Sequence, residues 1–162
     1  MTKTNRAQVV TGGLTVAEEK TVYRAMRVLE RAMKREEVPV FTSPTLTRVY
    51  LCMRMGTLEH EEFHVLWLDN RHRLIAADRM FTGTIDAAAV YPREIVKGAL
   101  QINAAAVIVA HNHPSGVPEP SQSDRTLTDR LRDALNLVDV RLLDHVIVGG
   151  NDTVSFSERG WL

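Results

Sequence analysis

The sequence predicts an α/β or α+β sandwich in which a mixed central β-sheet is flanked by helices. Amphipathic helical patterns alternate along the chain with short strand-like runs, which is typical of layered folds of this kind. The segment "AAAVIVA" at 104–110 is uniformly apolar, and such a run suits a strand buried on both faces. A length of 162 residues provides for one compact domain with a sizeable core.

The first predicted element is a helix that begins near Thr15, with Glu18 as the reciprocal partner of a capping box. Residues 1–14 are expected to be a loose lead-in. An apolar stripe at helical spacing runs along one face of this helix, and a basic stripe runs along the opposite face. The basic stripe consists of Lys20, Arg24, Arg27 and Arg31. We therefore expect residues 1–40 to be an N-terminal extension with one amphipathic helix, followed by the main domain at 41–162.

The charge distribution bears on possible partners. Residues 1–35 contain eight Lys or Arg and three Glu, a balance of +5 in a chain whose net charge is zero. We interpret the basic stripe as a solvated helix surface, and a weak contact to DNA is the alternative. The imbalance is far below the basic footprint that is typical of a dedicated nucleic-acid binder.

The later elements follow in order. "SPTLTRVYLCMRMG" predicts a helix, because Ser43 can cap it, Pro44 suits its first position and Gly56 can end it. "EEFHVLWLD" and "LIAADRMFTG" predict two strands joined by the turn "NRHR". "YPREIVKGALQIN" predicts a helix before the buried strand, and another helix begins near Ser121. "VRLLDHVIVGG" and "TVSF" predict the closing strands.

Composition excludes several classes of protein. Cys52 is the single cysteine of the chain, so it can neither form an internal disulfide nor build a thiolate zinc site. There is no apolar run of roughly 18 residues or more, and no apolar segment of signal-peptide type at the N-terminus. We therefore expect a cytoplasmic protein without membrane contact.

The segment "VIVAHNHPSGVPEPSQSD" at 107–124 carries the candidate site. His111 follows the buried strand, and His113 projects to the same side if the backbone stays extended, which Pro114 favours. A stiff loop then delivers Ser121 and Asp124 to a helix N-terminus. Two imidazoles and one carboxylate form the ligand set of a catalytic zinc site, whose fourth position is open to water.

The alternative interpretation of this segment is purely structural. Ser121-x-x-Asp124 before an apolar helical pattern is also a variant of the capping box. A His-x-His pair on its own is a weak signal as well. A cap, however, needs no histidines upstream, and the combination therefore favours a metal site.

These residues resemble the JAMM (MPN-type) metallohydrolase signature, which is His-x-His-Pro, a spacer and Ser-x-x-Asp. The RadC branch of that family is more similar, and the likeness covers roughly residues 42–162. It includes "EEFHVLWLDNRHRLI", "FTGTIDAAAVYPREIVKGAL", "AHNHPSG", "LLDHVIVG" and "VSFSERGWL". The spacer from Pro114 to Ser121 is six residues, one shorter than in the wider JAMM signature. The helix-hairpin-helix region usual in full-length RadC-like proteins is not recognisable, so we expect a short form.

The resemblance implies a fold, a cofactor and ligands. The fold is the cytidine-deaminase-like JAMM/MPN sandwich, and the cofactor is zinc (Zn2+). His111, His113 and Asp124 match the metal ligands of the family. Ser121 matches the residue that donates a hydrogen bond to the water or to the developing oxyanion.

The family also uses a glutamate from an upstream strand as general base. Glu59, Glu61 and Glu62 compete for this role. The RadC pattern Glu-x-Phe selects Glu61, because Phe63 follows it by two positions. Glu62 remains the second candidate.

The implied function is a zinc metalloprotease or metallohydrolase that cleaves peptide or isopeptide bonds in a protein or peptide substrate. One alternative is a DNA-repair-associated or other DNA-binding accessory role, since RadC-like proteins traditionally carry that label. The other is a non-catalytic MPN interaction module, against which the full ligand set argues. The sequence names neither a substrate nor an oligomeric state.

The remaining histidines are expected to be structural. His145 lies in an apolar strand and is predicted to be a hydrogen-bonded core residue, with a supporting role toward the ligands left open for Asp144 or His145. His60, His64 and His72 lie near polar turns and are expected at the surface.

Overall fold

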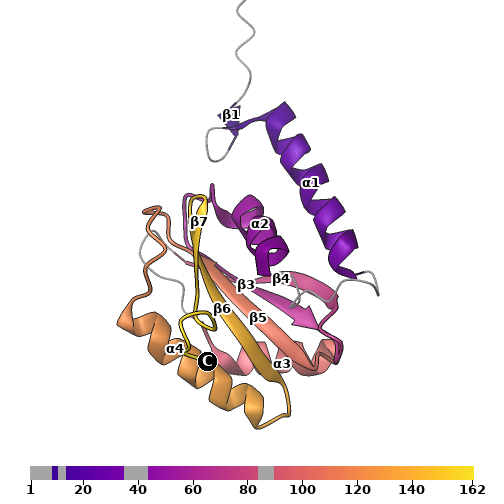
Figure 1. The fold of residues 1–162 in the computed structure, drawn as a ribbon, viewed down its shortest axis with the longest axis vertical. Helices are drawn as coiled ribbons and strands as arrows, with labels where there is room; N and C mark the ends of the chain where they lie inside the picture. Colours follow the sequence, from indigo (N-terminus) through magenta and orange to yellow (C-terminus); the bar gives the residue numbers. More distant parts are fainter. Residues whose placement is uncertain (1–8, 11–13, 35–43, 84–89) are drawn as a thin grey trace, which may run out of the picture.

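The structure is a computed structural model that describes residues 9–10, 14–34, 44–83 and 90–162. Its elements are β1 (Val9–Val10), β2 (Leu14–Thr15), α1 (Val16–Lys34), α2 (Pro44–Met55), β3 (Glu62–Leu68), β4 (Leu74–Thr82), α3 (Pro92–Ile102), β5 (Ala106–Asn112), α4 (Gln122–Asn136), β6 (Arg141–Gly149) and β7 (Asp152–Ser155). Within the described ranges, five strands form a mixed sheet in the order β4-β3-β5-β6-β7. Only β5 and β6 pair in parallel there, and helices cover both faces (Figure 1). The predicted α/β sandwich is therefore confirmed.

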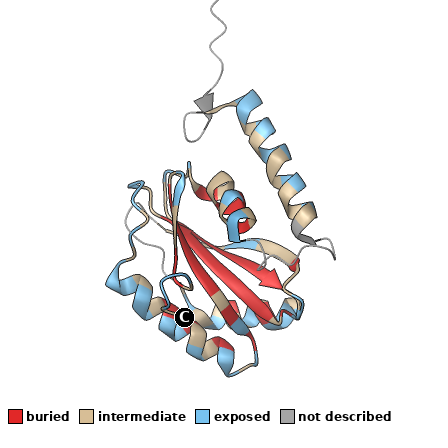
Figure 2. Cartoon of the chain, in the orientation of Figure 1, coloured by how far each residue is buried: buried red, intermediate tan, exposed pale blue. Residues whose placement is uncertain are grey.

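The two helices α1 and α2 cover one face of the sheet. Leu51 and Met55 of α2 share a buried cluster with Leu66 of β3 and Ile108 of β5. The central strands are buried along most of their length (Figure 2). Each fully buried side chain of this size contributes about 1.5–3 kcal/mol relative to an exposed one.

The other face of the sheet carries α3 and α4, and the candidate site lies on this side. Ile95 of α3 and Leu131 of α4 belong to the buried cluster that contains Phe63 and Val65 of β3. Strand alternation explains the division, since successive side chains of a strand point to opposite faces. Phe63 and Val65 face α3 and α4, whereas Leu66 faces α2.

The helix α1 begins as predicted. The Thr15 amide donates to a carboxylate oxygen of Glu18 at 2.7 Å, and the Glu18 amide donates to the Thr15 hydroxyl at 3.3 Å. Met26 and Leu29 pack against the α2 side of the core. The four residues of the basic stripe, Lys20, Arg24, Arg27 and Arg31, are all exposed, as expected of a solvated surface.

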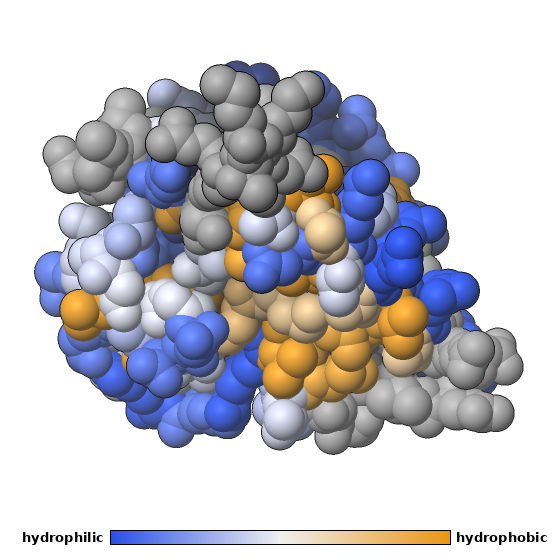
Figure 3. Space-filling view, turned by 90° about the horizontal axis from the view of Figure 1, so that it is seen from above, coloured by the Kyte–Doolittle hydropathy of each residue, from blue (hydrophilic) through white to orange (hydrophobic). Residues whose placement is uncertain are grey.

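Packing between α1 and the rest of the molecule is incomplete. A cavity of about 540 Å³ lies between the first half of α1 and the segment Thr57–Leu58, and Val22 and Met26 are among the residues that line it. Figure 3 looks onto the end of the molecule where α1 begins, and hydrophobic side chains gather there in one patch. A second cavity, of about 360 Å³, is lined by residues of α1 and β4 and by Arg54 of α2.

Two predicted segments differ from the structure. The buried strand β5 runs from Ala106 to Asn112 rather than over 104–110, and its end lies further on because His111 and Asn112 pair with the neighbouring strands. Part of the expected lead-in is also ordered, since Val9–Val10 pairs with Leu14–Thr15. Adjacent β-branched residues favour such pairing. In the part of the chain that the structure describes, no helix has the length and apolar character needed to cross a bilayer.

Candidate metal centre

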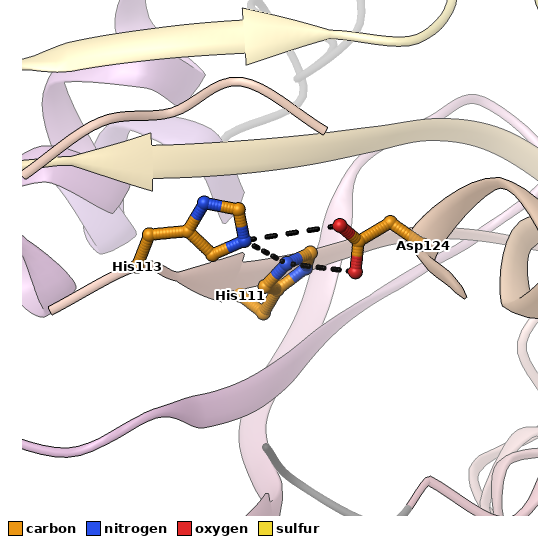
Figure 4. Close-up of side chains that lie close together, drawn as sticks. All are labelled: His111, His113 and Asp124. Carbon is orange, nitrogen blue, oxygen red and sulfur yellow. Dashed lines mark hydrogen bonds and ion pairs between the residues drawn. The ribbon is translucent and has the colours of Figure 1, made fainter. Parts of the chain in front are cut away.

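His111, His113 and Asp124 converge at the carboxyl end of β5 (Figure 4). His111 is the penultimate residue of this strand, His113 follows it, and Asp124 lies in the first turn of α4. The two Nε2 atoms of the histidines are 3.0 Å apart. Nε2 of His111 lies 3.3 Å from Oδ1 of Asp124, and Nε2 of His113 lies 3.8 Å from Oδ2. The structure thus brings the three expected ligands together.

These separations fit a zinc ion. Nitrogen and oxygen ligands bind zinc at about 2.0–2.1 Å, so ligand atoms in a tetrahedral site lie about 3.3–3.4 Å from one another. The observed distances of 3.0, 3.3 and 3.8 Å bracket that value. Two imidazoles and one carboxylate are also the donor types that zinc prefers. Among the described residues, no other three His, Cys, Asp or Glu side chains bring one ligand atom each within 4.8 Å of one another.

The orientation of His113 is fixed by the loop that follows it. Nδ1 of His113 lies 2.8 Å from the carbonyl oxygen of Val117. A carbonyl oxygen can only accept, so Nδ1 carries the proton and Nε2 offers its lone pair toward His111 and Asp124. The backbone amide of His113 donates to the Val148 carbonyl at 2.8 Å, which attaches the start of the loop to β6. His113 is therefore held ready to bind a metal.

Ser121 and Asp124 form the capping box that the sequence offered as the structural alternative. The Ser121 hydroxyl donates to Oδ2 of Asp124 at 2.6 Å, the Ser121 amide donates to the same oxygen at 2.7 Å, and the Asp124 amide donates to the hydroxyl at 3.2 Å. Oδ1 faces His111. The two interpretations are compatible, because the cap uses Oδ2 and leaves Oδ1 toward His111.

The charge state of Asp124 also suits a ligand. Burial alone would raise the pKa of its carboxyl, but the hydrogen bond and charge of His111 and the hydrogen bonds from Ser121 outweigh burial. The pKa of Asp124 is therefore held well below its ordinary value. A carboxylate that stays ionised is a better metal ligand than a protonated acid.

A third histidine lies behind His111. Nδ1 of His111 is 2.8 Å from Nε2 of His145, which is fully buried in β6. Nδ1 of His145 is in turn 2.6 Å from the Thr128 hydroxyl of α4. Burial holds the pKa of His145 well below its ordinary value. The prediction that His145 is a hydrogen-bonded core residue is confirmed.

The register of β3 separates two of the candidate glutamates. Phe63 pairs with His111, so the two side chains lie on the same face, and their rings are 6.2 Å apart between centroids. Strand alternation places Glu61, just before β3, on that face as well, and Glu62 on the other. Glu62 is buried and bonded to residues on the opposite face, which removes it from the candidate metal centre.

The environment of Glu62 corrects one expectation. His64, predicted at the surface, is buried, and its Nε2 donates to Glu62 at 2.7 Å while its Nδ1 accepts from Arg54 at 3.0 Å. Arg79 and His60 also contact the Glu62 carboxylate, at 2.9 and 3.0 Å. The polar residues before His64 in the sequence indicate an exposed strand end. In the fold this end is covered by the Arg54 side chain of α2.

Asn112, between the two candidate ligands, contacts the opposite segment. Its Oδ1 accepts from the Glu62 amide at 2.8 Å, and its Nδ2 donates to the His60 carbonyl at 3.0 Å. Asn112 thereby holds both residues that flank Glu61. Sequence reasoning did not assign it a role. Its position on the strand face opposite His111 was the available signal.

Fold and site together define an α/β sandwich with a His-His-Asp group that could hold a metal ion. The RadC-like JAB domain family matches residues 41–161 of the chain. The chain belongs to this family, as the motif resemblance indicated.

Curated relatives agree with the family assignment. A UPF0758 protein of Vibrio cholerae is 57% identical over 136 residues, which is 84% of this chain and 60% of that protein. A second UPF0758 protein of the same species is 56% identical over 145 residues, or 90% of each chain. A UPF0758 protein of Photobacterium profundum is 57% identical over 138 residues, 85% of this chain and 61% of that protein. The chain thus spans about 60% of the length of several of its relatives.

Proposed function

We propose that this chain is a zinc-dependent metallohydrolase that cleaves peptide or isopeptide bonds. The observation that carries the proposal is the convergence of His111, His113 and Asp124 at ligand-to-ligand distances that suit a tetrahedral zinc ion. These three residues would hold the metal. Zinc in such a site lowers the pKa of a bound water to about 7 and polarises a carbonyl group.

Glu61 is the proposed general base. Strand alternation carried back from Phe63, which pairs with His111, supports a place for Glu61 on the same face. A carboxylate in this role takes a proton from the attacking water and later delivers it to the leaving amine. Glu62 does not compete, because His64 and Arg79 already engage its carboxylate on the other face.

Ser121 is the proposed donor to the oxyanion that forms on the substrate. Its hydroxyl donates to Asp124 in this structure, so the role requires the hydroxyl proton to turn toward the substrate. The N-terminus of α4 adds backbone N–H groups and positive potential near the same point. A protein or peptide is the substrate class that this chemistry implies.

The experiment begins with metal content. We expect one zinc per wild-type chain and its loss in His113→Ala and in Asp124→Ala. Asp129→Ala is the matched control, because this aspartate lies on the same helix with 59% of its side chain exposed. Glu61→Gln should keep the zinc and lose hydrolysis of amide substrates. A wild-type chain that binds no zinc after the metal is added back would overturn the proposal.

The DNA-binding alternative has its own measurement. The exposed basic residues of α1 are the surface that would bind DNA. Binding of this kind weakens steeply with salt concentration. A salt-dependent affinity for duplex DNA that is lost on replacing Arg24 and Arg27 by Ala would favour an accessory role, and equal affinity in the variant would exclude that surface.

A further inference from the structure

A continuous chain of hydrogen-bonding contacts joins two of the proposed zinc ligands from behind. The Thr128 hydroxyl lies 2.6 Å from the main-chain carbonyl oxygen of Asp124 and 2.6 Å from Nδ1 of His145. Nε2 of His145 lies 2.8 Å from Nδ1 of His111. Thr128 is 2% exposed, His145 0% and His111 1%, so water does not compete for these contacts.

Counting protons fixes the direction of every bond in this chain. A carbonyl oxygen has no proton to give, so at 2.6 Å the Thr128 hydroxyl donates to Asp124. A hydroxyl has one proton, and Thr128 must therefore accept from Nδ1 of His145. With its imidazole proton on Nδ1, His145 offers Nε2 as an acceptor at 2.8 Å from Nδ1 of His111.

The last bond in the chain determines the state of His111. Because Nε2 of His145 accepts, Nδ1 of His111 donates to it and carries the imidazole proton. Nε2 of His111, which faces Asp124 and His113, is then the nitrogen that can give its lone pair to a metal. That is the tautomer a metal requires.

The reverse direction would block the site. If Thr128 donated to His145 instead, each imidazole proton would move to the other nitrogen, and Nε2 of His111 would present an N–H to the metal. Two oxygens that both act as acceptors would then face each other at 2.6 Å, at Thr128 and the Asp124 carbonyl. The carbonyl of Asp124 therefore selects the direction.

We infer that Thr128 and His145 are positioning residues that hold His111 in its metal-binding tautomer, with the main chain of Asp124 as the origin of the relay. This inference rests on the proposed zinc site and deepens it. The relay ties the non-metal side of one ligand to the backbone of another. Helix α4 thus positions Asp124 directly and sets the tautomer of His111 through Thr128.

The test is Thr128→Val, which keeps the side-chain shape and removes the hydroxyl. We expect its zinc dissociation constant, measured by chelator competition, to rise about 10- to 100-fold, as when partners of metal-binding histidines are removed. Thr128→Ser keeps the hydroxyl and should bind zinc within about threefold of wild type. Thr126→Val is the matched control: Thr126 also donates to the carbonyl four residues earlier, but on the exposed face of α4.

A second readout does not depend on metal. Two-bond ¹H–¹⁵N correlation spectra of the metal-free protein report which nitrogen of His111 carries the proton. We expect Nδ1–H in wild type, Thr128→Ser and Thr126→Val, and a shift toward Nε2–H in Thr128→Val. A purely structural role for Thr128 would lower the melting temperature without this change of tautomer.

Either of two results would overturn the inference: wild-type affinity for zinc in folded Thr128→Val, or an Nε2–H tautomer of His111 in the wild-type protein. If Thr128→Val does not fold, the wild-type spectrum still tests the inference. His145→Gln then replaces Thr128→Val as the variant. Failure of the proposed zinc site is a separate outcome, because it would appear as absent zinc in a wild-type chain whose His111 carries its proton on Nδ1.

Discussion

The backbone amide of Glu62 donates a 2.8 Å hydrogen bond to the side chain of Asn112, fifty residues further along the chain. The same Asn112 side chain donates to the His60 carbonyl at 3.0 Å. The residue between those two backbone contacts is Glu61, the proposed general base. Asn112 itself lies between His111 and His113. One amide side chain therefore sets the spacing between the proposed base and the proposed zinc ligands.

Replacing Asn112 by Ala should separate catalysis from metal binding. The rate of amide hydrolysis should fall at least about tenfold, because a displacement of about 1 Å in a catalytic group can cost about a hundredfold. Zinc content should remain at the wild-type level, since both histidine side chains point to the other face. The free energy of unfolding should fall by about 1–3 kcal/mol, because the buried Glu62 amide loses its acceptor.

Asn112→Asp refines this experiment. The aspartate keeps the oxygen that accepts from Glu62 and loses the amide donor to His60. Its hydrolysis rate should lie between those of Asn112→Ala and wild type. Wild-type turnover in a folded Asn112→Ala protein would show that Glu61 does not depend on this clamp.

The loop between β5 and α4, which contains Gly116 and Pro118, lies against the end of β6 at Gly149. A Cβ atom added there would be 2.6 Å from the Gly116 carbonyl oxygen and 2.6 Å from the Pro118 nitrogen. Gly149→Ala must therefore push the loop outward, and with it the Val117 carbonyl that orients His113. We expect zinc affinity, measured by chelator competition, to weaken about tenfold.

Gly98→Ala is the control for Gly149→Ala. Its added Cβ would meet the Trp67 ring at 2.9 Å, on α3 and away from the loop. Both variants should lose about 1–3 kcal/mol of stability through overpacking. Only Gly149→Ala should lose zinc affinity, and equal losses in the two proteins would mean that general destabilisation is the cause.

The order of the elements could be predicted from sequence because each follows from local signals. The strand 104–110 was recognised from its uninterrupted apolar run, and α4 from the cap at Ser121. The strand's extension through Asn112 was missed, because polar residues at a strand end look like the start of a loop. Only pairing with β3 and β6 keeps His111 and Asn112 in the sheet.

The candidate ligands could be predicted for a similar reason, since they lie within one segment of the chain. The residues that support them could not, because their partners come from distant segments. Thr128 contacts His145 only when α4 packs beside β6. Asn112 contacts Glu62 only when β5 pairs with β3. His64 was placed at the surface for want of the same information, as its partner Arg54 comes from α2.

Glu62 should make stability depend on acidity. Burial alone would raise the pKa of its carboxyl, but hydrogen bonds from His64 and Arg79 outweigh burial and lower the pKa below the ordinary 4.5. A depressed carboxyl pKa stabilises the folded state fully above the unfolded-state value and ceases to do so as pH falls through the folded-state value. Glu62→Gln should therefore be about 1–3 kcal/mol less stable than wild type near neutral pH.

The difference between Glu62→Gln and wild type should shrink below about pH 4.5 as the wild-type carboxyl becomes protonated. Urea unfolding at a series of pH values measures this difference in the free energy of unfolding. Glu59→Gln serves as the comparison, because Glu59 is exposed and should leave the curve unchanged. A Glu62→Gln deficit that is constant from neutral to acid pH would mean that the charge of Glu62 is not what stabilises the fold.

Tyr50 connects α1 to the domain through one buried hydroxyl. The hydroxyl donates to the Glu30 carboxylate of α1 at 2.9 Å and accepts from Arg54 at 2.8 Å. Arg54 also lies 3.4 Å from Glu30, and cavities of about 540 and 360 Å³ lie beside α1, so the polar contacts of Glu30 contribute to its attachment. Tyr50→Phe should therefore accelerate hydrogen exchange of the α1 amides, measured by mass spectrometry, while exchange in β5 stays slow.

Tyr23→Phe is the matched control, because Tyr23 is 62% exposed, and its α1 amides should exchange as in wild type. Unchanged exchange of α1 in Tyr50→Phe would show that the apolar contacts of Met26 and Leu29 suffice to hold the helix.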